Sequence, residues 1–307
     1  MTPKERILAQ IRRSNTGGKR KKRLSRPPRP IPPYRIERMY SSQLLAMRER
    51  LRELVREKFI PKLQHLSHNA NKFYGRQKND DFISEAFGDL DQVRVFFERQ
   101  YTDKALASIA RNVFNETQQL NGDNIKRTFK SVLGIDIFIN DTDLQNKADA
   151  FVFENVRFIK SANAKSFTDI ENAVLDGFKS GKRWETIAAE IQSTSKSEAL
   201  KDEDGNLLLD ENGDQMYGKL SDWDAERIAR DQVGKLNGEL EQSRQTDLGV
   251  TSYIWRTSLD ERVRPEHEML EGETFDWEGA DVCPDGAPGT PIMCRCSAEP
   301  ILDDLIN

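Results

Sequence analysis

The sequence predicts a mostly α-helical chain that ends in a small α+β domain and begins with a basic arm. Three observations lead to this fold class: apolar residues recur at helical spacing through the middle of the chain, prolines crowd the N-terminal segment, and polar and sulfur-containing residues gather near the C-terminus. We expect a basic, proline-rich arm over residues 1–35, a helical domain over 36–160 and an α+β domain over 161–307, with a hairpin insertion at 199–219.

The N-terminal arm is strongly basic. Residues 1–40 hold thirteen Lys and Arg against two Glu, a net charge of +11 in a chain whose total is −4. Prolines at 27, 28, 30, 32 and 33 exclude helix interior and favour an extended or disordered segment. Such an arm either contacts a polyanion, namely nucleic acid or an acidic protein surface, or is only a solvated tail. The predicted contact residues are Lys19, Arg20, Lys21, Lys22, Arg23, Arg26 and Arg29.

Four amphipathic patterns predict the helical domain. They cover residues 42–66, 80–101, 103–120 and a segment from Asp141 or Thr142 to Lys160. Pro61 is expected to kink or interrupt the first helix. Thr102 is the expected N-cap of the third, and Asn121-Gly122 is expected to end it. Residues 135–140 are predicted to form a short strand.

The C-terminal half begins with a predicted helix pair, 164–180 and 184–193. An acidic insertion with Asp-Gly and Asn-Gly turns follows, and it favours a surface hairpin over a calcium loop because the EF-hand spacing is absent. A helix from Ser221 or Asp222 to Gln245 leads to a strand over 249–257.

That strand delivers Trp255 to a dense polar segment that runs to Cys296. The ordered elements are Trp255, Asp260, Arg262, Arg264, His267, the pair Leu270 and Gly272, Phe275, Pro291 and the closing Cys294-Arg295-Cys296. This combination resembles the signature of the phage head morphogenesis family, the Mu F-like minor head proteins. The resemblance covers residues 160–302. Ile228-Ala229-Arg230-Asp231-Gln232, followed by Asn237, stands where the family has an I-A-R-T-E-like stretch.

The resemblance implies a structural, non-enzymatic minor capsid protein of a tailed double-stranded DNA phage or prophage. It would act in head morphogenesis near the portal. The expected partners are the portal protein, the major capsid protein or a scaffolding protein, with packaged DNA as a further partner of the arm. The implied location is the virion, after assembly in the host cytoplasm.

His267, Cys283, Cys294 and Cys296 together form a candidate structural zinc site. Thiolates and imidazole are the ligands that zinc prefers, and a metal would stabilise a segment poor in apolar residues. The spacing lacks C-x-x-C pairs, and Cys283 lies outside the family pattern, so Asp260 is an alternative fourth ligand. The competing interpretation is three free thiols packed as small apolar groups.

Asp260 and His267 also allow a catalytic interpretation. A histidine with a carboxylate is the minimum for general acid–base chemistry, and Arg262 and Arg264 could hold a phosphate, as in a metal-dependent nuclease or hydrolase packaged in the virion. The sequence has no nucleophile elbow and no glycine-rich phosphate loop. A buried network that fixes a turn, with Asp260 paired to Arg264 or Arg230, is therefore the favoured prediction.

The composition argues against a membrane protein and against a secreted, disulfide-bonded protein. No apolar run approaches the roughly 18 residues of a membrane span, and the N-terminus lacks a signal-peptide core. Three cysteines form no disulfide framework, so we expect a reducing compartment and no membrane partner.

Overall fold

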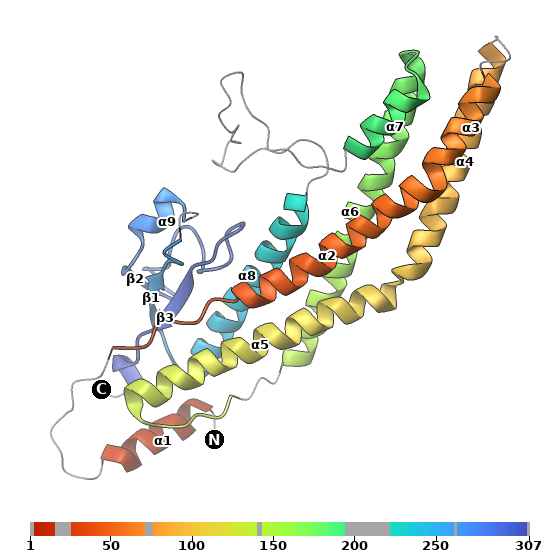
Figure 1. Ribbon diagram of the computed structural model, residues 1–307. Helices are drawn as coiled ribbons and strands as arrows, with labels where there is room; N and C mark the ends of the chain where they lie inside the picture. Colours follow the sequence, from red (N-terminus) through yellow and green to blue (C-terminus); the bar gives the residue numbers. More distant parts are fainter. Residues whose placement is uncertain are drawn as a thin grey trace. The chain divides into compact units, whose positions relative to one another are not determined.

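The computed structural model describes residues 3–15, 26–70, 76–139, 143–193, 222–260 and 263–305. It is 70% helical and has one small antiparallel sheet near the C-terminus, so the predicted fold class is confirmed. Figure 1 shows the element order. The helices are α1 (Pro3–Asn15), α2 (Tyr34–Leu54), α3 (Ile60–Ala70), α4 (Arg76–Gln100), α5 (Asp103–Leu133), α6 (Leu144–Lys179), α7 (Trp184–Ser193), α8 (Asp222–Asp247) and α9 (Pro265–Met269).

The described chain divides into two compact units, each built from separate stretches of sequence. One comprises residues 1–39, 111–152 and 227–307, and the other comprises 40–110 and 153–226. The long helices α2, α5, α6 and α8 each contribute residues to both units. The expected boundaries at 35 and 160 remain a prediction, and the expected hairpin at 199–219 lies outside the described residues.

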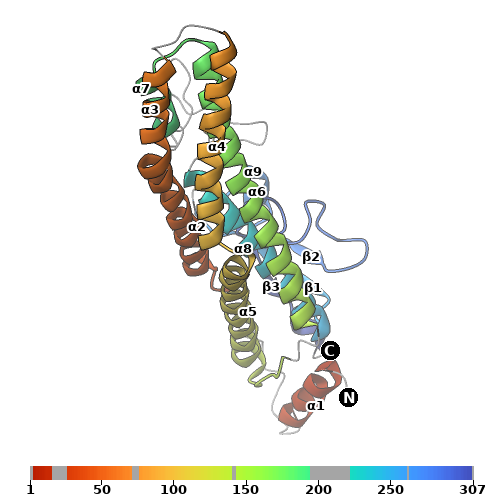
Figure 2. The ribbon, with the colours of Figure 1, turned by 90° about the vertical axis from the view of Figure 1, so that its right-hand side faces the viewer.

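The second unit is purely helical among its described residues, and α3, α4, α6 and α7 run alongside one another in both ribbon views (Figure 2). Its core is apolar and aromatic; Phe97, for example, lies 6.1 Å from Phe167 between ring centroids. A five-residue π-turn, η1 (Val55–Phe59), interrupts the first long helix one turn before Pro61. The predicted interruption is therefore confirmed, because a proline ring displaces the hydrogen bonding of the preceding turn.

The structure confirms one predicted helix cap and differs from two predicted helix ends. Thr102 does cap α5, with its hydroxyl accepting the Ala105 N–H at 3.3 Å. However, α5 continues through Asn121-Gly122 to Leu133, because Asn121 places its amide against Asn237 of α8, and this tertiary contact outweighs the local stop signal. The expected break between 160 and 164 is also absent, since α6 is one helix from Leu144 to Lys179.

Residues 135–139 are extended but pair with no strand in the described chain, so the predicted short strand is wrong as a sheet element. Their alternation of buried and exposed residues is nevertheless strand-like. Ile135 and Ile137 enter an apolar core with Leu248, Val250 and Leu302.

The first unit contains the sheet, in the order β2-β1-β3, with β1 (Ser252–Arg256), β2 (Thr274–Asp276) and β3 (Ser297–Pro300). The register places Trp255 opposite Ala298 and Ile254 opposite Thr274. Strand β1 falls inside the predicted strand 249–257. Its inward residues Tyr253 and Trp255 join all three cysteines in one buried cluster.

Candidate metal centre

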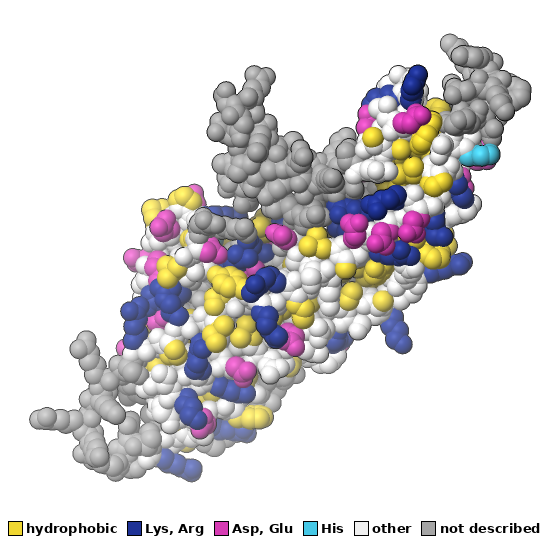
Figure 3. Space-filling view, viewed as in Figure 1, with side chains coloured by type: hydrophobic (Ala, Val, Ile, Leu, Met, Phe, Trp, Pro, Cys, Tyr) yellow, Lys and Arg dark blue, Asp and Glu magenta, His cyan; other side chains and the backbone are white. Residues whose placement is uncertain are grey.

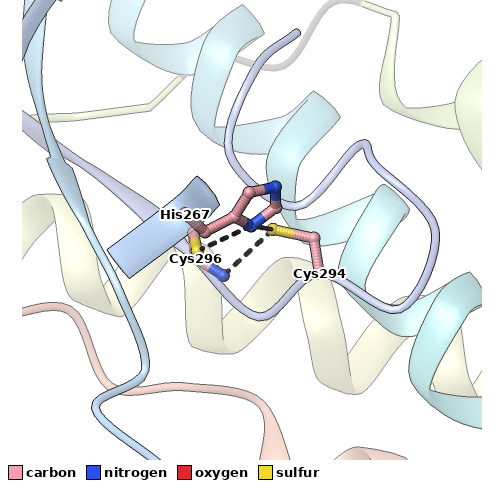
Figure 4. Close-up of side chains that lie close together, drawn as sticks. All are labelled: His267, Cys294 and Cys296. Carbon is pink, nitrogen blue, oxygen red and sulfur yellow. Dashed lines mark hydrogen bonds between the residues drawn. The ribbon is translucent and has the colours of Figure 1, made fainter. Parts of the chain in front are cut away.

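The site forms where α9 faces the loop that leads into β3. His267 projects from α9, and Cys294 and Cys296 lie in the segment that leads into β3. The three side chains are 3 to 5% exposed, and their ligand atoms all lie within 4.8 Å of one another. Figure 4 shows both sulfur atoms directed at the imidazole. His267 Nδ1 lies 3.5 Å from each Sγ.

This spacing fits a metal ion. A tetrahedral zinc with ordinary bond lengths separates a ligating nitrogen from a ligating sulfur by about 3.6 Å. The donors are one imidazole nitrogen and two thiols, the soft set that zinc prefers. This buried group could therefore hold a metal ion.

The pKa values of the two thiols are shifted in opposite directions. Hydrogen bonds from the Cys296 thiol and from His267 together lower the pKa of Cys294 to about 5, against the effect of burial. The hydrogen bond between the two thiols, together with burial, raises the pKa of Cys296. The hydrogen bond with Cys294 in turn raises the pKa of His267. The thiolate form of Cys294 is thus favoured beside His267, and thiolate is the form that ligates metals.

The second nitrogen of His267 has its own partner. His267 Nε2 lies 2.5 Å from Asp285 Oδ2, which leaves Nδ1 as the atom directed at the thiols. A carboxylate on the far nitrogen orients a ligating histidine and raises its basicity. Trp255 packs edge-on against the imidazole, with ring centroids 5.3 Å apart. Asp285 did not emerge from the sequence, because it follows the histidine by 18 residues in an irregular loop.

Cys283 occupies the same buried cluster but is not one of the three converging ligands. Its side chain packs with Trp277 and Tyr253, and burial raises the pKa of its thiol. The structure therefore brings together three of the four predicted ligands. Asp260, the predicted alternative, points elsewhere and binds Arg295 at 3.1 Å.

The loop that carries Cys294 is seated directly on α8. A Cβ added at Gly234 would lie 2.7 Å from the Cys294 carbonyl oxygen, and one added at Gly238 would lie 2.4 Å from that of Pro288. Both contacts are closer than real Cβ atoms approach, so only glycine permits this packing. The sequence analysis did not identify this close approach, although two glycines one helical turn apart are a signal for it.

The remaining signature residues support this frame. Gly272 has φ +89°, a conformation that favours glycine, and its N–H donates to the Trp255 carbonyl at 2.9 Å. Phe275 packs against Trp255 with ring centroids 6.2 Å apart. Arg264 donates to the Ile292 carbonyl at 2.8 Å. Arg262 lies outside the described residues.

Asp260 and His267 are engaged separately. Asp260 accepts from Arg295, while His267 contacts Asp285 and the thiols. Asp260 also lies close enough to Tyr34 to raise the pKa of that phenol, although burial is the larger cause. The favoured structural role of Asp260 agrees with its ion pair to Arg295, and the expected pairing with Arg264 or Arg230 stays a prediction.

Part of the basic arm is bound to this unit. Arg29 donates to the Thr257 carbonyl at 3.4 Å and forms an ion pair with Glu271. The Ile31 backbone exchanges hydrogen bonds with the Asn124 side chain, at 3.0 Å as donor and 2.9 Å as acceptor. Arg26 is exposed, and Lys19 to Arg23 lie outside the described residues. Arg29 thus has an internal ion pair, and its predicted contact with an external partner stays a prediction.

The fold and the site together define a class of protein: a helical protein that carries a compact Cys/His module on a three-stranded sheet. Residues 168–299 match the family model described as phage Mu protein F like protein. This match confirms the family resemblance inferred from the signature between Trp255 and Cys296.

A relative from Haemophilus influenzae, described as an uncharacterized protein, is 28% identical over 211 residues. The alignment covers 68% of this chain but 42% of the relative, so the chain spans less than half of that protein. No solved structure matches the chain. Within the part of the chain that the structure describes, no helix is long and apolar enough to cross a bilayer.

Proposed function

We propose that this chain is a structural protein of phage head assembly, a minor head component of a tailed double-stranded DNA phage or prophage that acts near the portal. The observation that carries the proposal is the Mu F-like match over 168–299, which coincides with the buried Cys/His module. The family is one of morphogenesis proteins, and the module is a buried cluster in which all three cysteines pack with Trp255. The portal, major capsid or scaffolding protein is the partner we propose.

Detection in purified particles tests this role. Phage particles from the bacterium that encodes the chain should contain the protein in the head fraction, and deletion of its gene should leave defective or empty heads. A deletion strain that releases normal, infectious particles would overturn the proposal.

We further propose that the ion at the Cys/His cluster is zinc and that its role is structural. His267, Cys294 and Cys296 would hold it, and Asp285 would orient His267. Cys283 is the nearest predicted candidate for a fourth ligand and would reach the ion only after a local rearrangement. The ion would cross-link α9 to the start of β3 in a segment with little apolar surface.

Metal analysis of protein purified without chelator tests the zinc proposal. We expect one zinc per chain, lost in the Cys294→Ser, Cys296→Ser variant together with a lower melting temperature. A Cys283→Ser variant separates three-ligand from four-ligand binding. An intact protein without metal would contradict the zinc proposal and would mean that the thiols are packed as small apolar groups.

The arm residues Lys19 to Arg23 are the proposed contact with packaged DNA. Five adjacent cations neutralise phosphates and release counterions, so binding should weaken steeply with salt. Lys19 to Arg23 are the densest cationic stretch of the sequence. Over the face shown in Figure 3, by contrast, basic and acidic side chains are interspersed. Replacement of all five by Gln should flatten the salt dependence, and an unchanged slope would refute the contact.

The nuclease alternative, with Asp260 and His267 as its catalytic pair, stays a prediction. Plasmid nicking with and without added divalent metals, compared with a His267→Ala variant, decides it. Nicking that disappears in the variant would replace the structural proposal.

A further inference from the structure

Arg295 separates the two candidate metal ligands in sequence and points away from them. Successive residues in an extended segment project to opposite sides, so Cys294 and Cys296 face His267 while Arg295 faces the start of α2. Its guanidinium lies 2.6 Å from Glu37 Oε2 through Nη2 and 3.0 Å from the same oxygen through Nε. It also lies 4.8 Å from the centre of the Tyr34 ring.

This contact is unusually well enclosed for an ion pair. The Glu37 side chain is 6% exposed and that of Arg295 is 18% exposed. Asp260 completes the shell around the guanidinium at 3.1 Å from Nη1. A carboxylate this deeply buried is costly without its partner, so Glu37 and Arg295 hold each other in place.

Glu37 lies in the first turn of α2, at the point where the arm joins that helix. Its backbone N–H donates to the Pro33 carbonyl at 3.0 Å, which ties it to the residues just before α2. We call residues 26–33 the strap. The strap has a second attachment near the site, because Arg29 pairs with Glu271, four residues after His267.

We propose that Arg295 is a positioning residue that couples metal binding at His267, Cys294 and Cys296 to the seating of the strap and the first turn of α2. This inference rests on the proposed metal site. Ligation of both thiolates holds the Cys294-Arg295-Cys296 backbone in one conformation, and that conformation aims Arg295 at Glu37. Loss of the metal frees this turn and weakens the contact that closes the strap on the module.

The coupling is reciprocal. If metal binding favours the seated strap, a seated strap raises metal affinity by the same factor, and couplings of this kind typically amount to about 5- to 150-fold. A module with a bound strap would therefore retain its metal more tightly than one whose strap is displaced by a partner.

Amide hydrogen exchange of the full-length chain, zinc-loaded and chelator-stripped, tests the coupling. Peptides that cover residues 29–40 report on the end of the strap and the first turn of α2, and those that cover 82–100 of α4 report on global unfolding. Zinc removal should speed exchange in the first set by at least about 5-fold and leave the second unchanged. Equal exchange of the strap in both forms, or parallel acceleration in α4, would overturn the proposal.

Glu37→Gln provides the decisive variant, because it keeps the shape of the side chain and removes its charge. We expect its zinc affinity, measured by competition with a chelator, to fall below that of the wild type. The factor should be about the same as the factor by which zinc removal accelerates strap exchange in the wild type. In this variant, zinc removal should no longer change the rate of amide exchange in the strap. Arg35→Gln is the matched control, since Arg35 pairs with Glu116 at the same end of α2 and does not contact Arg295. Its zinc affinity should equal that of the wild type.

These measurements separate the two proposals. A wild-type chain that retains zinc while Glu37→Gln binds it equally well refutes the coupling and leaves the metal site standing. A wild-type chain that binds no zinc refutes the metal site and the coupling with it. Arg295→Lys adds a second probe, because a lysine keeps the charge but loses the two-point contact with Glu37.

Discussion

His267 Nε2 lies 2.5 Å from Asp285 Oδ2, and this contact directs the opposite ring nitrogen at two cysteine sulfurs. The pair connects α9 to the loop before Gly286, so the orientation of the imidazole depends on a residue that is itself half exposed, with 51% of its side chain accessible. The carboxylate thus supports the candidate metal ligand, and its removal should weaken metal binding.

Replacement of Asp285 by Asn should weaken zinc binding by about 10- to 100-fold, because the amide supports the ligating histidine less strongly than a carboxylate does. Competition with a chromophoric chelator measures this change. Asp281→Asn, an exposed position in the same loop, is the control and should bind zinc as the wild type does. Equal affinities of the Asp285 variant and the wild type would contradict a supporting role.

The buried ion pair between Arg256 and Glu299 is expected to be sensitive to loss of one partner. Arg256 Nε lies 2.7 Å from Glu299 Oε2, and the Glu299 side chain is fully buried. Arg256→Met should lower the free energy of unfolding by about 3–5 kcal/mol, since it strands a buried carboxylate. Urea denaturation measures the loss.

Two further variants test the cause. A double variant, Arg256→Met with Glu299→Leu, should recover much of the stability, because it removes the stranded charge. Lys130→Met, which breaks the exposed pair with Asp136, should cost less than about 1 kcal/mol. A double variant no more stable than the single one would show that packing, and not charge, dominates.

Gly238→Ala should destabilise the module and weaken zinc binding together. Its Cβ would lie 2.4 Å from the Pro288 carbonyl oxygen, so either α8 or the loop that leads to Cys294 must move. Such overpacking typically costs about 1–3 kcal/mol. Gly88→Ala in α4 is the matched control, because nothing lies within 4 Å of its added methyl and alanine favours a helix. Thermal unfolding and chelator competition measure both effects, and a neutral Gly238 variant would contradict the close approach.

Glu241 should make stability depend on pH. Burial raises its pKa from 4.5 to about 8, against the hydrogen bonds that it accepts from Ala298 and Asn237. Because the folded-state pKa is the higher one, its protonated form stabilises the fold at low pH. That contribution is lost as the pH rises from about 4.5 through about 8.

Glu241→Gln cannot ionise and should therefore gain stability relative to the wild type as the pH increases over that window. Denaturant unfolding of both proteins at several pH values measures the difference. A difference independent of pH would mean that Glu241 is ionised in the folded state throughout.

The helices and the strand β1 were predictable because their signals are local. Helical spacing of apolar residues, the Thr102 cap and the Pro61 interruption each act within a turn or two of chain. The predictions failed where a distant segment intervened. Asn121-Gly122 has the local chemistry of a helix end, but the Asn121 amide bonds to Asn237, 116 residues away, and the helix continues.

The candidate site divides in the same way. The sequence by itself determined the soft ligands, their order and the family resemblance, because these depend on residue identity and spacing. Only the tertiary structure decided which ligands meet. It left Cys283 in the apolar cluster, paired Asp260 with Arg295, and brought Asp285 and Glu37 to the site from loops and helices remote in sequence. The physical reason is that ligand convergence and ion pairing depend on distances of a few ångströms. Contacts between segments far apart in the sequence set these distances, and local sequence does not.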